Sequence, residues 1–375
     1  MSTRDRLRAA ADALRYHGSG WWLDSALPHS APGVIAFAVG APALWFAVGF
    51  ALAGNRADYL ATPDILFQLP FFAIHVLALR AMGTLWARSL GPALDKLALE
   101  PRWARRMRDL VCGRWVNVGA LAACAFFVVR DTVFGLRPNA TGLIPFDDPE
   151  MWDFASLGRP VHLMMLGLWH AEWWMFGYLL WLQIACLFGL SMALHRTDFS
   201  PHLARVLAEN AYRDLFQLIG RSATICLVFA IANLLFIQVT GELLPRESVD
   251  IDGVWSFLTE MSDLLSTTLL FVLLLGGFIV CLAALRRSLT RAVAALFAES
   301  SDRALAELAQ PLEATGNVDA DLGRLRDRVE AQAGIIRAVA FQREVDQLGG
   351  KTLTLVAVKA AVPLITAVLK LLRMH

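Results

Sequence analysis

Six long apolar segments, separated by polar connectors, dominate the pattern of this chain. They cover approximately residues 33–53, 65–87, 116–136, 161–188, 223–240 and 264–285. A helix needs about 20 apolar residues to cross the roughly 30 Å hydrocarbon core of a membrane, and each segment reaches or nearly reaches that length. Barrel strands would instead alternate in polarity over short stretches. The pattern therefore predicts an all-α fold, a polytopic transmembrane helical bundle of about six spans.

The connectors alternate in charge along the chain. Cations gather before the first span, between the second and third, after the fourth and after the sixth, whereas the other connectors hold few: Arg56, Arg137, Arg159 and Arg246. Short connectors rich in Lys and Arg are retained on the cytoplasmic side of a membrane. We therefore expect a multi-pass protein of a bacterial-type inner (plasma) membrane, with the N- and C-termini in the cytoplasm.

The segments outside the bundle suggest three further units. Residues 1–32 are expected to form a cytoplasmic N-terminal segment with an interfacial helix, residues 33–286 the six-span bundle, and residues 287–350 a cytoplasmic helical hairpin. Residues 351–375 are apolar for nearly a span's length but carry Lys359 and Pro363 near their middle. Because a lysine at mid-bilayer depth costs several kcal/mol, we expect an amphipathic interfacial helix there, with a seventh span as the alternative.

The cytoplasmic C-terminal helical region offers a candidate surface for partners. Leu322, Leu325, Val329, Ile336 and Val339 recur at three- and four-residue spacing, which places them on one stripe of a helix. The stripe is expected to fold back on the preceding helix or on the membrane face, or to associate with a second copy. A homo-oligomer, or a cytoplasmic protein bound through residues 302–345, are the corresponding partner hypotheses, beside the lipid bilayer itself.

Composition narrows the class of protein. Hydrophobic residues make up 57% of the 375 positions and the mean hydropathy is +0.52, which lies outside the soluble class. The net charge of +1 provides no basic field for nucleic acid, so no nucleic-acid partner is expected. The five cysteines are widely spaced and four lie in apolar stretches, which argues against a disulfide framework.

Ionisable residues inside spans are costly and mark the first places to look for function. His75 in the second span and His170 and Glu172 in the fourth lie about as deep as one another, near the expected midplane. We expect them to form an intramembrane polar cluster, in which His75 meets Glu172 between the two helices. The alternative is that these groups only tie two helices together, at about 1 kcal/mol per hydrogen bond.

Other polar residues in the spans are secondary candidates. Arg130 and Asp131 in the third span are expected to extend to the outer interface or to pair with neighbouring helices, and Arg80 to reach the cytoplasmic headgroups. Thr267 and Thr268 in the sixth span either line a polar path or bond across helices.

Known catalytic and nucleotide-binding motifs are absent from the sequence. It contains no phosphate loop, no dinucleotide-binding glycine fingerprint and no HExxH zinc pattern, so enzymatic activity, a cofactor and a metal site are not expected. His75 with His170 is the one pair suited to ligate a b-type haem between helices.

Two classes of function remain. The first is a small channel- or transporter-like permeation protein whose midplane polar cluster lines a pathway. The second is a membrane-embedded sensor or scaffold whose cytoplasmic helices recruit a partner. An intramembrane enzyme ranks behind both.

Overall fold

The computed structural model describes residues 3–97, 99–134, 157–197, 199, 211–239, 276–295, 298, 322–323 and 326, and all structural statements below concern these residues. They are almost entirely helical, with no strand among them, which confirms the predicted all-α class. The helices are α1 (Thr3–Ala13), α2 (Trp22–Ala26), α3 (Ala31–Leu52), α4 (Arg56–Ala61), α5 (Pro63–Lys96), α6 (Pro101–Cys112), α7 (Arg114–Phe134), α8 (Arg159–Ile184), the π-helical η3 (Ala185–Leu190), α9 (Ser191–Arg196), α11 (Ala211–Val239) and a helix over 276–295.

Three of these helices are long and apolar enough to cross a membrane, namely Ala31–Leu52, Ile65–Lys96 and Leu163–Arg196. They coincide with the first, second and fourth predicted spans, although α5 continues past the predicted end at residue 87 to Lys96. α7 and α11 are helical over the third and fifth predicted spans. The sixth predicted span lies largely outside the described residues. Six spans therefore remain a prediction, and three candidates are established.

Helix α3 presents its large apolar side chains outward. Its buried residues include Ala38, Pro42 and Gly49, whereas Val39 and Leu44 are more than half exposed. A helix facing water would bury the large residues and expose polar ones, so this distribution suits hydrocarbon surroundings. The start of α3 is fixed locally, because the Ser30 side chain accepts a hydrogen bond from the backbone N–H of Gly33 at 3.2 Å.

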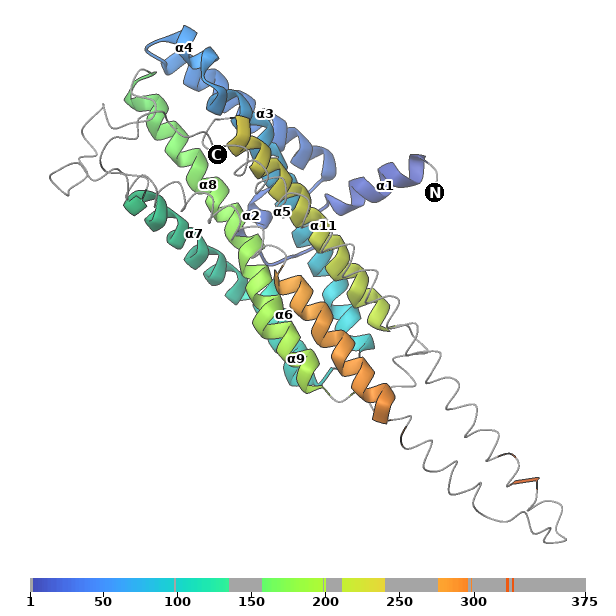
Figure 1. Ribbon diagram of the computed structural model, residues 1–375. Helices are drawn as coiled ribbons and strands as arrows, with labels where there is room; N and C mark the ends of the chain where they lie inside the picture. The colour runs from blue at the N-terminus through green and yellow to red at the C-terminus, as the bar shows by residue number, and fades with distance from the viewer. Residues whose placement is uncertain are drawn as a thin grey trace, which may run out of the picture.

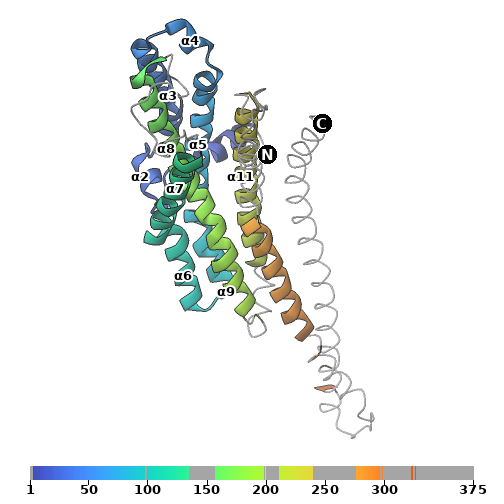
Figure 2. The same cartoon turned by 60° about the vertical axis from the view of Figure 1, so that its left-hand side comes forward.

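The long helices run alongside one another in an elongated bundle (Figures 1 and 2). α6 and α9 lie at one end of it, and α4 lies at the other. Small residues allow the closest approaches. A Cβ on Gly177 of α8 would lie 2.4 Å from the Ala120 carbonyl oxygen of α7, and one on Gly119 would lie 2.0 Å from the Trp181 ring. Such contacts fix how the two helices are rotated against each other.

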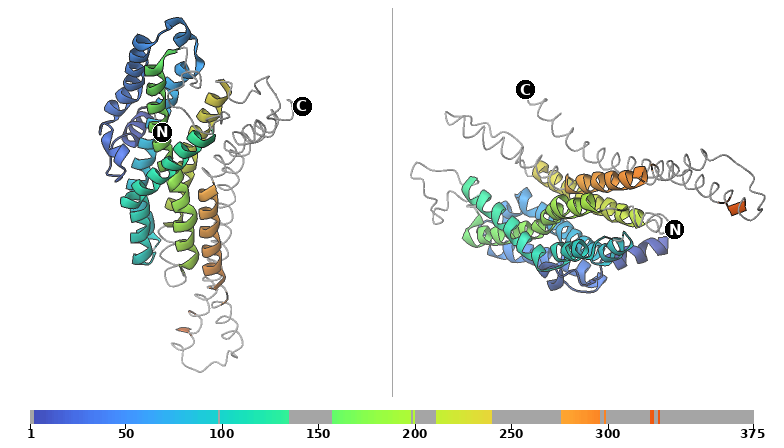
Figure 3. Two further views of the ribbon diagram at one scale, coloured as in Figure 1. Left: turned by 90° about the vertical axis from the view of Figure 1, so that its left-hand side faces the viewer. Right: turned by 90° about the horizontal axis from the view of Figure 1, so that it is seen from below.

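Helices α8, η3 and α9 follow one another without a break, and the helix over 276–295 packs against the C-terminal part of this continuous helix (Figure 3). A Cβ on Gly277 would lie 2.2 Å from the Gln183 carbonyl oxygen, and the Ser288 hydroxyl donates to the Leu194 carbonyl at 2.6 Å. The helix extends beyond residue 285, the predicted end of the sixth span. The proposed hairpin over 287–350, the partner surface over 302–345 and the interfacial helix over 351–375 lie almost wholly outside the described residues.

The cation-rich connector between the second and third spans is itself helical. α6 turns Ala104, Met107 and Val111 inward and leaves Arg105 and Arg108 exposed. This spacing is that of an amphipathic helix lying against the bundle. The connector is therefore packed against the bundle, which the Lys and Arg content of the connectors did not predict.

Candidate functional site

Glu172 of α8 and Gln68 of α5 form a polar pair inside the bundle. Glu172 is 5% exposed and Gln68 is fully buried. The Gln68 Nε2–H donates to Glu172 Oε2 at 2.5 Å, which joins residues 104 positions apart in the chain. The other carboxylate oxygen of Glu172, Oε1, and the amide oxygen of Gln68, also Oε1, are buried and have no hydrogen-bond partner within the described part of the chain.

His75 lies on the same face of α5, two helical turns from Gln68. Its Nδ1–H donates to the Phe71 carbonyl at 2.9 Å. The imidazole packs edge-on against the Phe71 and Phe229 rings, with centroids 4.3 Å and 4.4 Å away. His75 is therefore held in an aromatic environment between α5 and α11.

The sequence predicted a polar cluster of His75, His170 and Glu172 in which His75 meets Glu172 and His170 faces elsewhere, and the structure gives His75 and Glu172 different hydrogen-bond partners. Glu172 and His75 are both buried, but the hydrogen bond to Glu172 comes from Gln68 and that of His75 goes to its own helix backbone. His170 is exposed on another face of α8. Because His75 is buried and His170 is exposed, the structure does not bring them together as a haem-ligating pair.

The remaining candidates from the sequence are not described. Arg130 and Asp131 belong to α7, but their side chains fall outside the described part, and Thr267 and Thr268 lie in the undescribed stretch before residue 276. Within the residues that are described, no group of three or more His, Cys, Asp or Glu side chains is arranged to hold a metal ion.

The pair between Glu172 and Gln68 has more acceptors than donors. One N–H of the Gln68 amide donates to one oxygen of the Glu172 carboxylate, and the Oε1 atoms of both residues receive no hydrogen bond. A buried acceptor without a donor costs roughly 1–3 kcal/mol, and more when it is charged. The site is therefore chemically suited to a species that brings positive charge or a hydrogen-bond donor.

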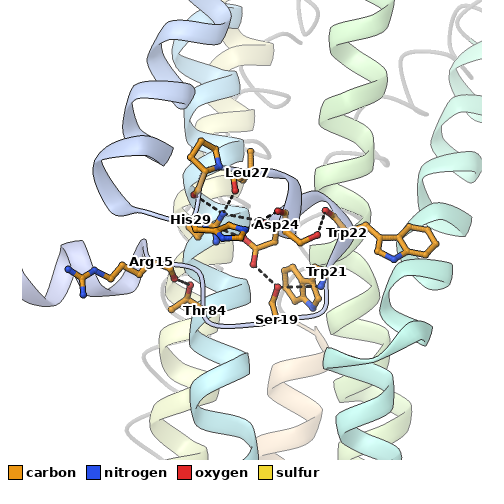
Figure 4. Close-up of polar contacts among 11 residues, drawn as sticks. Arg15, Ser19, Trp21, Trp22, Asp24, Leu27, His29 and Thr84 are labelled. Carbon is orange, nitrogen blue, oxygen red and sulfur yellow. Dashed lines mark hydrogen bonds and ion pairs between the residues drawn. The ribbon is translucent and has the colours of Figure 1, made fainter.

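A second polar site, which sequence analysis missed, binds the N-terminal segment to the bundle (Figure 4). Arg80 and Asp24 are both fully buried, and the Arg80 Nε lies 3.1 Å from the Asp24 Oδ1. The Arg80 Nη2–H groups also reach the backbone carbonyls of Asp24, Leu27 and Pro28 at 2.8 Å, 3.3 Å and 3.1 Å. The expectation that Arg80 extends to lipid headgroups is therefore wrong, because the N-terminal segment supplies its partners within the protein.

Burial and hydrogen bonding act in opposite directions on Asp24. Burial raises the pKa of the Asp24 carboxyl above its ordinary value, although the hydroxyl of Ser19, which donates at 2.5 Å, and the charge of Arg80 act to lower it. Gly83 permits the approach, because a Cβ there would lie 2.8 Å from the Asp24 Oδ2. One signal in the sequence could have revealed this site. Asp24 is the last acidic residue before the first span, and its charge is opposite to that of Arg80 within the second span.

Asn117 of α7 connects the N-terminal segment to α8. Its Oδ1 accepts from the Trp22 backbone N–H at 2.9 Å and from the Tyr178 hydroxyl at 2.7 Å, and its Nδ2 donates to the Gly20 carbonyl at 2.9 Å. Trp21 is fully buried and stacks on Tyr178, with ring centroids 5.1 Å apart. The segment thus occupies the space between α5, α7 and α8.

The route of the segment depends on two glycines. Gly18 and Gly20 have φ of +72° and +74°, a region that side chains with a Cβ rarely adopt. At Gly20 a Cβ would also lie 2.2 Å from the Cys112 carbonyl oxygen. Glycine at these two positions therefore lets the chain turn into the bundle without backbone strain, and at Gly20 it also avoids a collision with α6.

Comparisons with known proteins give no family for this chain. No protein-family model matches it, no curated protein is significantly similar to it, and no solved structure matches it.

Proposed function

We propose that this chain is a multi-pass inner-membrane permeation protein, a small channel or transporter, in which Glu172 and Gln68 form the polar site that the permeating species meets. Three of its helices could cross a membrane. The outward-facing large apolar residues of α3 support lipid surroundings. Six spans, cytoplasmic termini and a bacterial-type membrane are part of the proposal; the six apolar segments support the number of spans, and the charge pattern of the connectors supports the orientation.

One observation supports permeation over a purely anchoring bundle. A carboxyl group 95% shielded from solvent faces an amide across α5 and α8, and each keeps one oxygen without a donor. The structural pair of Arg80 and Asp24 also keeps buried atoms without a hydrogen bond, but its carboxylate has a cation 3.1 Å away, whereas among the described residues no ion pair is formed by Glu172. Ionisable residues within spans commonly mark substrate or ion pathways. Glu172 is therefore the proposed contact point on the pathway.

Reconstitution into liposomes tests the proposal. Proteoliposomes carrying the full chain are expected to dissipate an imposed gradient of protons, sodium or potassium faster than protein-free liposomes. Glu172→Gln keeps the size of the side chain but removes its charge, so we expect the flux to fall to the protein-free level. Asp109→Asn makes the same chemical change at an exposed position of α6 and is expected to leave the flux unchanged.

The outcome is decisive in both directions. Wild-type flux equal to that of empty liposomes for all three ions would contradict the proposal. Flux that survives Glu172→Gln would remove Glu172 from the pathway. Size-exclusion chromatography and thermal unfolding of both variants establish that a loss of flux is not a loss of folded protein.

A further inference from the structure

We infer that Glu172 and Gln68 form a proton-binding site, in which the Glu172 carboxyl is the neutral acid and the Gln68 carboxamide is its partner. That the proton is also the permeating ion rests on the proposed function. The protonation of the pair does not rest on it, and can be measured separately.

The hydrogen-bond pattern carries the inference. An amide N–H of Gln68 already donates to Glu172 Oε2. The acceptors that receive no hydrogen bond are Glu172 Oε1 and Gln68 Oε1. A proton that adds to a lone pair of Glu172 Oε1 converts that acceptor into a donor. The new O–H donates to the Gln68 Oε1 once the two groups align, so that acid and amide each donate one hydrogen bond and each accept one. A single proton thus removes both unsatisfied acceptors.

The same proton removes the charge. An ionised carboxylate in apolar surroundings is far more costly to bury than a hydrogen-bonded neutral acid. Loading requires only that a proton bind to the oxygen, and release returns the carboxylate, with no other bond made or broken. The site can therefore fill and empty without a co-reactant.

A metal cation fits the site less well than a proton. Hard cations such as Ca²⁺ and Mg²⁺ take about six or more oxygen ligands, whereas this pair leaves two oxygens free. In the described part of the chain no group of three or more His, Cys, Asp or Glu side chains is arranged to hold a metal ion. A proton needs only two oxygens, one to bond to and one to accept its hydrogen bond, and this pair offers both.

The other titratable groups in the core are engaged elsewhere. On α5, His75 donates to the Phe71 carbonyl and Arg80 pairs with Asp24. The span of α3 contains no ionisable side chain. The other buried titratable side chains on the described helices are Tyr59 on α4, Tyr178 on α8, Cys186 on η3, Tyr212 and Cys226 on α11 and Cys281 on the 276–295 helix. None of the contacts described for them supplies a cation to Glu172.

Infrared spectroscopy of the full chain in lipid nanodiscs tests the inference. A protonated carboxylic acid has a carbonyl stretch that an ionised carboxylate lacks. We expect this band near neutral pH in the wild-type protein, its loss in Glu172→Gln and its retention in Asp109→Asn. In Gln68→Leu the band is expected to move to higher frequency, because the acid carbonyl loses the hydrogen bond from the amide.

Combined with the flux assay, the spectra separate the two proposals. Absence of a band assignable to Glu172 overturns the inference, whatever ion the protein conducts. A Glu172-dependent band without flux of any ion supports the proton site and contradicts permeation. A band together with proton flux that Glu172→Gln abolishes supports both. If Glu172→Gln does not fold, Glu172→Asp replaces it, and the band is then expected to shift instead of disappearing; an unchanged band would overturn the assignment to Glu172.

Discussion

The Arg80 guanidinium lies 3.1 Å from the Asp24 carboxylate, and neither side chain is exposed to solvent. The contact joins the N-terminal segment to the middle of α5, 56 positions further along the chain. Each ion loses its hydration on burial, so the pair is held in place by the additional hydrogen bonds from Ser19 and to the backbone carbonyls near α2.

Removing one partner of this pair is expected to destabilise the protein strongly. Arg80→Met leaves the Asp24 carboxylate buried without its cation, and we expect the free energy of unfolding to fall by about 3–5 kcal/mol. The double variant Arg80→Met with Asp24→Leu is expected to lose less than either single variant. Chemical unfolding in detergent, followed by tryptophan fluorescence, measures the differences.

An exposed ion pair provides the control for that measurement. Arg108 and Asp95 lie 2.6 Å apart on α6 and α5, with side chains 46% and 67% exposed. Solvent screens such a pair, so Arg108→Gln is expected to change stability by no more than about 1 kcal/mol. Equal losses for Arg80→Met and Arg108→Gln would contradict the structural role assigned to the buried pair.

Two glycines on α8 are expected to respond in opposite directions to the same substitution. Gly177→Ala places a methyl group 2.4 Å from the Ala120 backbone oxygen, so α7 and α8 must move apart, at an expected cost of about 1–3 kcal/mol. At Gly167 nothing lies within 4 Å of the added methyl, and alanine favours the helix by about 0.5–1 kcal/mol. Thermal unfolding of both variants is the test, and stabilisation by Gly177→Ala would refute the close packing.

Asn117 is expected to control how firmly the N-terminal segment is docked. Asn117→Ala leaves the Trp22 N–H, the Tyr178 hydroxyl and the Gly20 carbonyl without their partner. We expect faster hydrogen exchange over residues 20–27, with little change in α3. Asn55→Ala serves as the control, because Asn55 caps α4 through exposed local hydrogen bonds and its loss should affect exchange only there.

The contact between α1 and α5 is expected to weaken at acid pH. The hydrogen bond from Arg88 holds the pKa of Asp12 below its ordinary value of 3.8, and His17 and Arg15 act in the same direction. A carboxyl with a lowered folded-state pKa stabilises the fold above 3.8 and loses that contribution as the pH falls through the lowered pKa. Hydrogen exchange over residues 3–13, after correction for the intrinsic rate, should therefore rise as the pH falls below 3.8. Arg88→Gln removes the largest of the interactions that lower this pKa and is expected to reduce the rise, so an equal rise in the variant and the wild type would contradict the prediction.

Part of the candidate site could be predicted from the sequence, and part could not. The position of Glu172 within a long apolar helix follows from the sequence, and its depth in a membrane, counted at about 1.5 Å per residue, stays a prediction. The partner could not be found by the same route, because a search for ionisable residues passes over a neutral amide such as Gln68. His75 and Gln68 occupy the same face of α5, and the sequence contains no information on which of them lies level with Glu172.

The sequence by itself determined the helical class and the positions of three apolar helices, because a backbone surrounded by hydrocarbon has to satisfy its own hydrogen bonds within each segment. The tertiary structure alone decided which side chains meet. The pairings of Glu172 with Gln68 and of Arg80 with Asp24 depend on the rotation and axial position of neighbouring helices and on the path of the N-terminal segment. Those are set by close contacts between residues distant in the chain, such as that of Gly177 with Ala120, and not by the polarity pattern of any one segment.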